Sequence, residues 1–261
     1  MGPFALTSAL VLSLGWVLVF GVAPHAPVPG PTTDVPATPS IDDGLKGAQC
    51  WRPVFAGDAS DSDIAGAMAV LSARAAAMGI GAAEHLDPAE IALTAPLPDG
   101  LWQRGQVMIA EVLEAGALPS AAIPEGALTD ASGREWLLPG APIAADGRLI
   151  VAAYPVDDMT RAMGVNIELS AQAAVVLGDL TERLAAQTPP GRVVIALDGV
   201  ALTAPTVMMR IDGGAAQITG HMTSREAAET AAVLAAGPLP VQITDVSGPV
   251  PCGDWIETTR N

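Results

Sequence analysis

Three histidines are the residues of this chain with the most versatile chemistry near neutral pH, and none has the neighbours that a metal site needs. His85 lies near Glu84 and Asp87, but a metal ion requires three or four converging ligands. The sequence contains neither H-x-x-x-H nor H-E-x-x-H, the spacings that place two imidazoles on one helix face. We interpret His85 as a solvated loop residue, His221 as a surface residue and His25 as part of a linker, and we predict no metal site.

Two pairs of carboxylates are the next candidates for chemistry. Asp157 and Asp158 are expected at the N-terminus of a short helix, where the helix dipole favours negative charge. Asp179 and Glu182 are expected on a solvated helix face. Two carboxylates close in sequence do not form an acid–base pair without a cleft that holds a substrate. The sequence therefore indicates no general acid or base.

Motifs for nucleophilic catalysis and phosphate binding are also missing from the sequence. It has no G-x-S-x-G turn, and Lys46, the only lysine, is not part of an S-x-x-K motif. The glycine-rich turn at 212–214 is not followed by G-K-S/T. We predict that the protein is not an enzyme and that it has no catalytic or cofactor-binding residues; an envelope hydrolase is the enzymatic alternative.

The charge of the chain narrows the choice of partners. The formal net charge is −16 and no basic stripe is present, whereas nucleic acids and anionic membrane surfaces select Lys and Arg. Aromatic residues make up only 3% of the chain, so the core must be packed from Ala, Val, Leu, Ile and Met. We predict a globular protein that binds no nucleic acid.

The N-terminal segment predicts a membrane anchor or a signal peptide. Residues 4–23 contain no charged residue and are about long enough to span a bilayer as a helix. No basic residue precedes them and no clean cleavage site follows, which favours an uncleaved anchor over a signal peptide. A linker over 24–48, rich in Pro and Thr, follows. We expect a single-pass membrane protein with an extracytoplasmic domain, which would be secreted if the leader were cleaved.

The two cysteines, Cys50 and Cys252, bracket nearly all of the sequence after the leader. One interpretation is a pair of reduced, buried thiols. The other is a disulfide, which the leader favours because it directs the chain to an oxidising compartment.

Local signals are clearest between 191 and 241. The apolar run Val193–Leu197, the turn Asp198-Gly199 and the segment Val200–Thr203 predict a β-hairpin. Thr223 and Glu226 form a capping box that predicts a helix start, and Gly237 followed by Pro238 predicts its end.

Other patterns predict further elements of an α+β fold. Apolar residues at helical spacing predict a helix over 61–78, and a second helix is expected from Ser170 to about Ala186. Strands are expected at 50–56, 91–95, 106–113, 149–154, 165–169, 217–220 and 239–246. Residues 114–145 are rich in Gly, Pro and Ala and are interpreted as a connector, and 157–163 as a short helix.

Four short motifs in this order resemble the first extracytoplasmic domain of SecD, the protein-export subunit. They are L-D-G-x-x-x-T-A-P (with Leu197, Asp198, Gly199, Thr203, Ala204 and Pro205), Q-I-T-G (Gln217, Ile218, Thr219 and Gly220), T-x-x-E-A (with Glu226 and Ala227) and G-x-L-P-V from Gly237. An earlier region resembles the family more loosely, with Arg74 on a helix, then Gly79-Ile80 and a strand that ends in proline.

The resemblance implies a ferredoxin-like base of two βαβ halves with an inserted α+β head. The expected division is an anchor or signal peptide (1–23), a linker (24–48), the first part of the base (49–115), a connector and head (116–222), the second part of the base (223–247) and a tail (248–261). In this plan the first and last strands are neighbours, which would bring Cys50 and Cys252 within bonding range.

The resemblance also implies a function. It suggests an accessory binding module in protein export that contacts translocating polypeptide or Sec components. The alternative is a cell-envelope structural or interaction protein that keeps the fold without a role in export, because a fold does not determine function.

Overall fold

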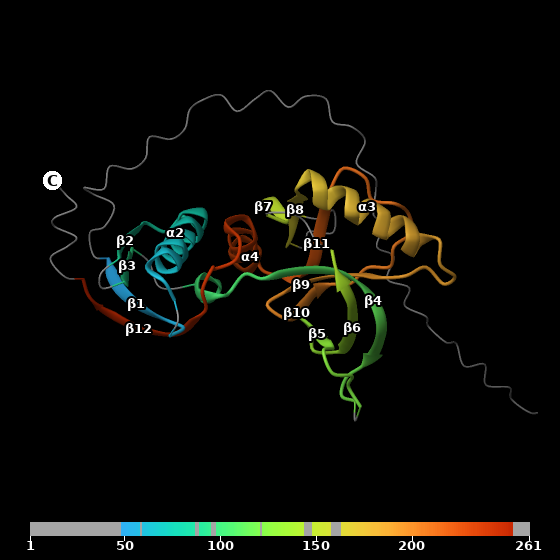
Figure 1. Ribbon diagram of the computed structural model, residues 1–261, viewed down its shortest axis with the longest axis horizontal. Coiled ribbons are helices and arrows are strands. Elements are labelled where there is room, and N and C mark those ends of the chain that lie inside the picture. The colour runs from blue at the N-terminus through green and yellow to red at the C-terminus, as the bar shows by residue number, and fades with distance from the viewer. Residues whose placement is uncertain are drawn as a thin grey trace, which may run out of the picture.

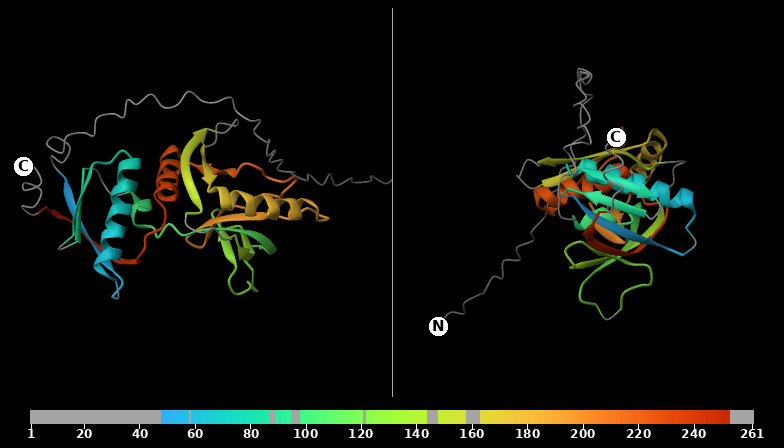
Figure 2. Two further views of the ribbon diagram at one scale, coloured as in Figure 1. Left: turned by 45° about the horizontal axis from the view of Figure 1, so that its top comes forward. Right: turned by 90° about the vertical axis from the view of Figure 1, so that its left-hand side faces the viewer.

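Three β-sheets and three α-helices form the described part of the chain, which comprises residues 48–252 except 58, 87–88, 95–97, 121, 144–147 and 158–162 of this computed structural model. The fold is α+β, as the sequence predicted (Figure 1). Two modules lie along the long axis of the molecule, and α4 (Ser224–Ala236) lies between them (Figures 1 and 2).

The first module, which we call the base, consists of one sheet and helix α2 (Asp61–Ala77). Its sheet has the order β12-β1-β3-β2, and every neighbouring pair is antiparallel. The strands are β1 (Gln49–Phe55), β2 (Ala82–Leu86), β3 (Ala89–Leu93) and β12 (Ile243–Pro251). Helix α2 connects β1 to β2 and packs Met68 and Leu71 against Ile91 and Leu93 of β3.

Helix α2 begins where the sequence predicted. The Ser60 hydroxyl accepts a hydrogen bond from the Asp63 N–H at 3.2 Å, and the Asp63 carboxylate accepts one from the Ser60 N–H at 3.1 Å. This capping box satisfies two donors that the first helical turn would otherwise leave unpaired. The helix ends before Gly79, whose positive φ of 73° an L-residue with a side chain adopts at a cost.

The second module, which we call the head, contains a closed five-stranded barrel in the order β10-β5-β6-β4-β9. Its strands are β4 (Val107–Ala117), β5 (Leu128–Asp130), β6 (Glu135–Pro142), β9 (Val193–Leu197) and β10 (Val200–Thr203). The predicted hairpin of β9 and β10 is confirmed, with Asp198 and Gly199 both at positive φ in the turn.

The interpretation of 114–145 as a connector was wrong, because this segment contains the end of β4, all of β5 and all of β6. Gly116 lies opposite Trp136 in the β4–β6 ladder, and a Cβ at Gly116 would lie 2.6 Å from the indole ring. The glycine thus makes room for a buried tryptophan across the strand pair. The predicted boundary at 115 falls inside β4, a barrel strand.

The head also contains a three-stranded sheet, β11-β8-β7, with helix α3 (Ala171–Ala185). Its strands are β7 (Ile150–Asp157), β8 (Met163–Leu169) and β11 (Ala215–Met222), so β11 is longer than the predicted 217–220. The short helix predicted over 157–163 is wrong at its two described ends, because Asp157 belongs to β7 and Met163 to β8; 158–162 lie outside the described residues.

Strand β9 explains how the barrel is attached to this sheet. All five of its residues are buried. Val194 and Ala196 point into the barrel core, while Val193, Ile195 and Leu197 belong to the core shared with α3 and β8. Because alternate residues of a strand face opposite sides, one strand contributes to two cores, which is why its sequence is continuously apolar.

Helix α4 packs against α2 on one side and against β7 and β8 on the other (Figure 1). Its buried residues Ala227, Ala231, Val233 and Leu234 belong to the core of the head. Its capping box is present as predicted, and Gly237 follows its last residue at a positive φ of 86°. The helix expected to belong to the base thus has its core contacts in the head.

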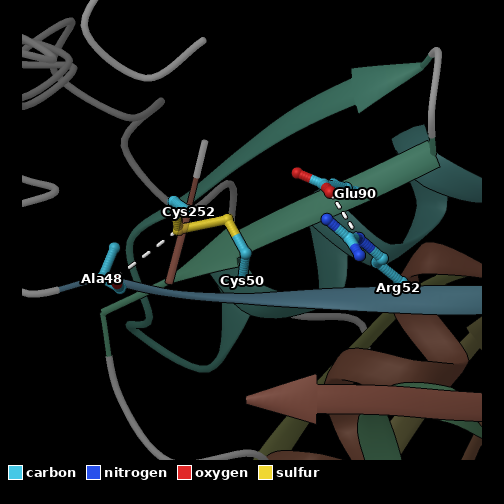
Figure 3. Close-up of a disulfide and its surroundings, with 5 residues drawn as sticks. All are labelled: Ala48, Cys50, Arg52, Glu90 and Cys252. Carbon is cyan, nitrogen blue, oxygen red and sulfur yellow. Dashed lines mark hydrogen bonds and ion pairs between the residues drawn. A yellow bond between two sulfur atoms is a disulfide. The ribbon is translucent and has the colours of Figure 1, made fainter. Parts of the chain in front are cut away.

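The two cysteines are joined by a disulfide at the edge of the base (Figure 3). Cys50 pairs with Val250 in the antiparallel ladder of β1 and β12, so the two Cα atoms of the cysteines are only 4.9 Å apart. Cys50 is completely buried. The disulfide therefore connects β1 to the residue that follows β12, the last strand of the described chain, across 202 residues of sequence.

We predict that reducing this disulfide destabilises the protein. A cross-link over so long a loop restricts the unfolded chain, and the loss is expected to be about 2–5 kcal/mol in the free energy of unfolding. Urea titrations with and without reductant measure it. The Cys50→Ser/Cys252→Ser variant is the control and should not respond to reductant. A midpoint that is unchanged by reduction in the native protein would contradict the prediction.

Candidate functional site

A buried arginine lies where the base meets the head. Arg74, on α2, is completely buried, and its guanidinium donates to backbone carbonyls. Nη1 donates to Leu101 O at 2.9 Å and to Gln103 O, and Nη2 donates to Gly237 O at 2.8 Å and to Arg104 O at 3.3 Å. Burial lowers the pKa of Arg74 to about 10, an effect that the charge of Asp198 opposes. The side chain still carries its charge at neutral pH.

Asp198 holds the same segment from the side of the head. Its carboxylate accepts hydrogen bonds from Gly105 N–H at 2.9 Å and from Gln106 N–H at 2.8 Å. The Asp198 N–H in turn donates to Gln106 O at 2.9 Å. Asp198 is at a positive φ of 49°, a conformation that Asp and Asn tolerate better than most residues. The hairpin turn of the barrel thus binds the segment directly before β4.

Two open depressions lie on the head next to this junction. The first has a volume of about 510 Å³ and is lined by Arg104, Gln106, Met108, Asp198 and Gly199, among others. The second has a volume of about 480 Å³ and is lined mainly by apolar residues of β6 and α3, including Ile143, Val176 and Leu180. Pro142 lines both. The two depressions are therefore neighbours on one surface of the head.

Ion pairs hold charged side chains at the edge of the second depression. Arg183 pairs with Glu111 of β4 at 2.6 Å, and Arg210 pairs with Asp179 and Glu182 of α3 at 3.0 and 2.7 Å. Hydrogen bonds from Arg210 to Asp212 and then to Asp179 raise the pKa of its guanidinium. These pairs are exposed and contribute little to stability, and two of their members, Asp179 and Arg183, line the second depression beside its apolar residues.

The structure does not bring the sequence motifs together into one cleft. Asp198 and Gly199 line the first depression, while Leu197 is buried below them. Thr203 ends β10, and the carbonyls of Ala204 and Pro205 accept hydrogen bonds from Arg192 Nε and Val193 N–H. Among these motif residues, only those of the hairpin turn therefore line one of the two depressions.

The second group of motif residues lies in β11 and α4, where some are buried in the head while Gln217 and Glu226 are exposed. Residues Gln217, Ile218, Thr219 and Gly220 lie in β11, with Ile218 completely buried. Glu226 caps α4, and Ala227 is completely buried on the inner face of that helix. Of this group, Ile218 and Ala227 thus contribute to the core of the head.

Sequence reasoning did not identify the role of Arg74, although the sequence carried a signal. Arg74 follows Leu71 by three residues and precedes Met78 by four, so it lies on the apolar face of its helix. An arginine in that position must be hydrogen-bonded in the interior. The half-buried ion pair of Arg192 with Glu135, at 2.7 Å, joins β6 to the segment before β9 and had no local signal.

The described residues contain no group of three or more His, Cys, Asp or Glu side chains that could hold a metal ion. His85 lies in β2 and His221 lies in β11. The structure does not describe their side chains, and His25 lies outside the described residues. Among the described residues no helix is both long and apolar enough to cross a membrane; the predicted anchor at 1–23 lies outside them.

This α+β architecture is that of SecDF proteins. A solved structure described as a membrane component SecDF that enhances protein export matches 77% of this chain and 99% of its own, with a TM-score of 0.53 and 20% identity. The crystal structure of SecDF in Super-membrane-facing form matches 81% of this chain and 32% of its own, with a TM-score of 0.55 and 22% identity.

Sequence comparison identifies the head more narrowly. Residues 123–241 match the family model of the SecDF P1 head subdomain. The SecD subunit of Aquifex aeolicus is 37% identical over 115 residues, 43% of this chain and 22% of the subunit, and that of Rhodobacter capsulatus is 31% identical over 170 residues, 64% of this chain and 28% of the subunit. Residues 123–241 therefore form a SecD/SecDF-type head domain, while the chain spans only about a quarter of these relatives.

We predict that Asp198→Asn destabilises the protein by about 1–3 kcal/mol, because an amide cannot accept the two N–H bonds as a charged carboxylate does. Asparagine tolerates the positive φ, so backbone strain does not contribute. Thermal or urea unfolding measures the change. Asp212→Asn, on a carboxylate that is 79% exposed, is the matched control and should change stability by less than about 0.5 kcal/mol. Equal effects of the two substitutions would contradict this assignment.

Glu226 predicts a pH dependence of stability. Its carboxylate accepts hydrogen bonds from the Thr223 N–H at 2.7 Å and the Thr223 hydroxyl at 2.8 Å, and these bonds lower the pKa of Glu226 below its model-compound value of 4.5. A lowered folded-state pKa stabilises the fold above the unfolded-state pKa, and this contribution is lost as the pH falls through the folded-state value.

The free energy of unfolding of the native protein should therefore exceed that of Glu226→Gln near neutral pH, and the difference should shrink between about pH 5 and pH 3. Urea titrations across this range measure it. Thr223→Ala removes one of the two donors and should keep a smaller pH-dependent difference. A difference between the native protein and Glu226→Gln that does not vary with pH would contradict this role.

Proposed function

We propose that this protein is a non-enzymatic accessory binding module in protein export, whose head contacts translocating polypeptide or components of the Sec machinery. The observation that carries the proposal is the match of 123–241 to the SecDF P1 head subdomain. All the residues that line the second depression lie within the matched segment, including Pro142, Val176 and Leu180. The binding surface would therefore be part of the segment that resembles the family.

The two depressions suit an extended polypeptide in several respects. Both are open to solvent, so a chain could enter and leave without a conformational gate. Ile143, Val176 and Leu180 offer apolar contacts to side chains, and Arg104 and Gln106 offer donors to backbone carbonyls. Such contacts depend little on sequence, as a module that meets many secreted chains would need. The net charge of −16 would disfavour anionic polymers as competitors.

We also infer that the base is ferredoxin-like. The antiparallel order β12-β1-β3-β2, with α2 between β1 and β2, supports this inference. In this proposal α4 holds the place in the chain order of the second helix of that fold, although its buried residues belong to the core of the head. The described chain begins at β1 and ends at β12, which are neighbours in the sheet (Figure 1). An anchor at 1–23 would then attach the base to a membrane and leave the head free to meet partners.

In-cell photocrosslinking tests the function. A photoreactive residue at Val176, in the second depression, or at Met208 or Met209, which are 68% and 54% exposed on the head, should crosslink to secreted chains or Sec components. The same residue at Val54, which is 46% exposed on the base, is the matched control and should crosslink much less.

The partners identified in this experiment decide between the two functions that the sequence suggested. Many secreted chains, or Sec components, would place the protein in export. A single unrelated envelope protein, or a cell-wall polymer, would overturn the export function and favour the envelope-interaction alternative. Equal crosslinking from Val54 would show that the depressions are not the binding surface.

A further inference from the structure

The chain passes between base and head twice, and Arg74 contacts both passages. The first passage is the segment 98–106, which contains the short helix η1 (Asp99–Trp102) and leads from the base to β4. The second is 237–242, which leads from α4 back to β12. The guanidinium donates to carbonyls at 101, 103 and 104 in the first passage and at 237 in the second. A single side chain of the base therefore binds both connections to the head.

The two passages are also bound to each other and to the head. Leu239 N–H donates to Arg104 O at 2.8 Å, which links the second passage to the first. Asp198, in the hairpin turn of the barrel, accepts from the N–H groups of Gly105 and Gln106. A continuous path of hydrogen bonds thus runs from α2 through both passages to the barrel.

Gly105 shows how closely these groups are packed. It has a positive φ of 77°, and a Cβ at this position would meet the Arg74 guanidinium and lie 3.1 Å from Gly237 O and 3.2 Å from Val233 Cγ1. The glycine is required because the first passage must approach the guanidinium and α4 at once. The passages are therefore shaped around the arginine side chain.

The remaining contact between the modules specifies their orientation less strictly. It is mainly the packing of α2 against α4, two helices rich in alanine. Packed helices adopt preferred crossing angles with a scatter of about 15–20°, so this contact alone defines the angle between the helices only loosely. A planar guanidinium with several fixed donor directions constrains this angle more tightly, because rotation of the head would leave buried carbonyls without a donor.

We infer that Arg74 is a positioning residue that fixes the orientation of the head relative to the base, because its guanidinium donates hydrogen bonds to both chain passages. Its loss leaves each module folded around its own core and releases the angle between them. The inference concerns the conformation of the protein and does not depend on the function proposed above.

The distribution of distances between the modules tests this inference in the full 261-residue chain in detergent. Spin labels attached to p-acetylphenylalanine at Val54 of the base and Val175 of α3, both exposed, avoid the disulfide cysteines. Double electron–electron resonance should give a narrow distribution for the otherwise native chain, and Arg74→Met should broaden it by roughly twofold while the far-ultraviolet circular dichroism is preserved.

Two further variants make the result decisive. Arg192→Met removes a similar guanidinium that pairs with Glu135 within the head, and it should leave the distribution narrow. Gly105→Ala keeps the charge of Arg74 but displaces its side chain, and it should broaden the distribution as Arg74→Met does. The second variant decides the case if Arg74→Met does not fold.

A narrow distribution in a folded Arg74→Met or Gly105→Ala variant would overturn the inference. Equal broadening by Arg192→Met would also overturn it, since the effect would then reflect general destabilisation. Because the readout is a distance in the purified protein, neither result bears on whether the head contacts secreted polypeptide.

Discussion

The buried charge of Arg74 is the constraint on which the arrangement of the two modules depends. A charged group removed from water must be hydrogen-bonded, and the guanidinium, with a pKa of about 10, keeps its charge. Among the hydrogen bonds that the structure describes, the acceptors of the guanidinium are backbone carbonyls, and none is a carboxylate. Peptide carbonyls converge on one point only if the chain bends around it, and the positive φ of Gly105 and the position of Asp198 follow from that requirement.

The head is organised around a different requirement, which is that β9 contributes to two cores. Its alternate residues fill the barrel on one side and the layer with α3 and β8 on the other. This attachment brings the end of β6 next to α3, where Pro142, Val176 and Leu180 form the apolar depression. The candidate surface is thus a consequence of how barrel and sheet share a strand, and none of the motif residues of β11 and α4 lines it.

The residues that match SecDF and the hydrogen bonds of the Arg74 guanidinium lie largely in different parts of the molecule. The matched residues 123–241 include Asp198 and Gly237, whereas Arg74 and the carbonyls of Leu101, Gln103 and Arg104 precede them. The hydrogen bonds of Arg74 therefore join the matched residues to the part of the chain outside the match. Within the head, the sequence motifs mark a hairpin turn, the edge strand β11 and a helix cap, which are features that preserve a shape. A preserved shape is compatible with more than one partner.

The sequence by itself determined the elements whose signals are local. The β9–β10 hairpin, the capping box at Thr223 and the amphipathic helices follow from residues within a few positions of one another. Only the tertiary structure decided the barrel strands β5 and β6, the place of α4 and the role of Arg74. The partners of these residues are far away in the chain: Trp136 is accommodated by Gly116, and Arg74 is satisfied by a carbonyl 163 residues later. Local propensity contains no information about such partners, because their burial and pairing exist only when the modules have assembled.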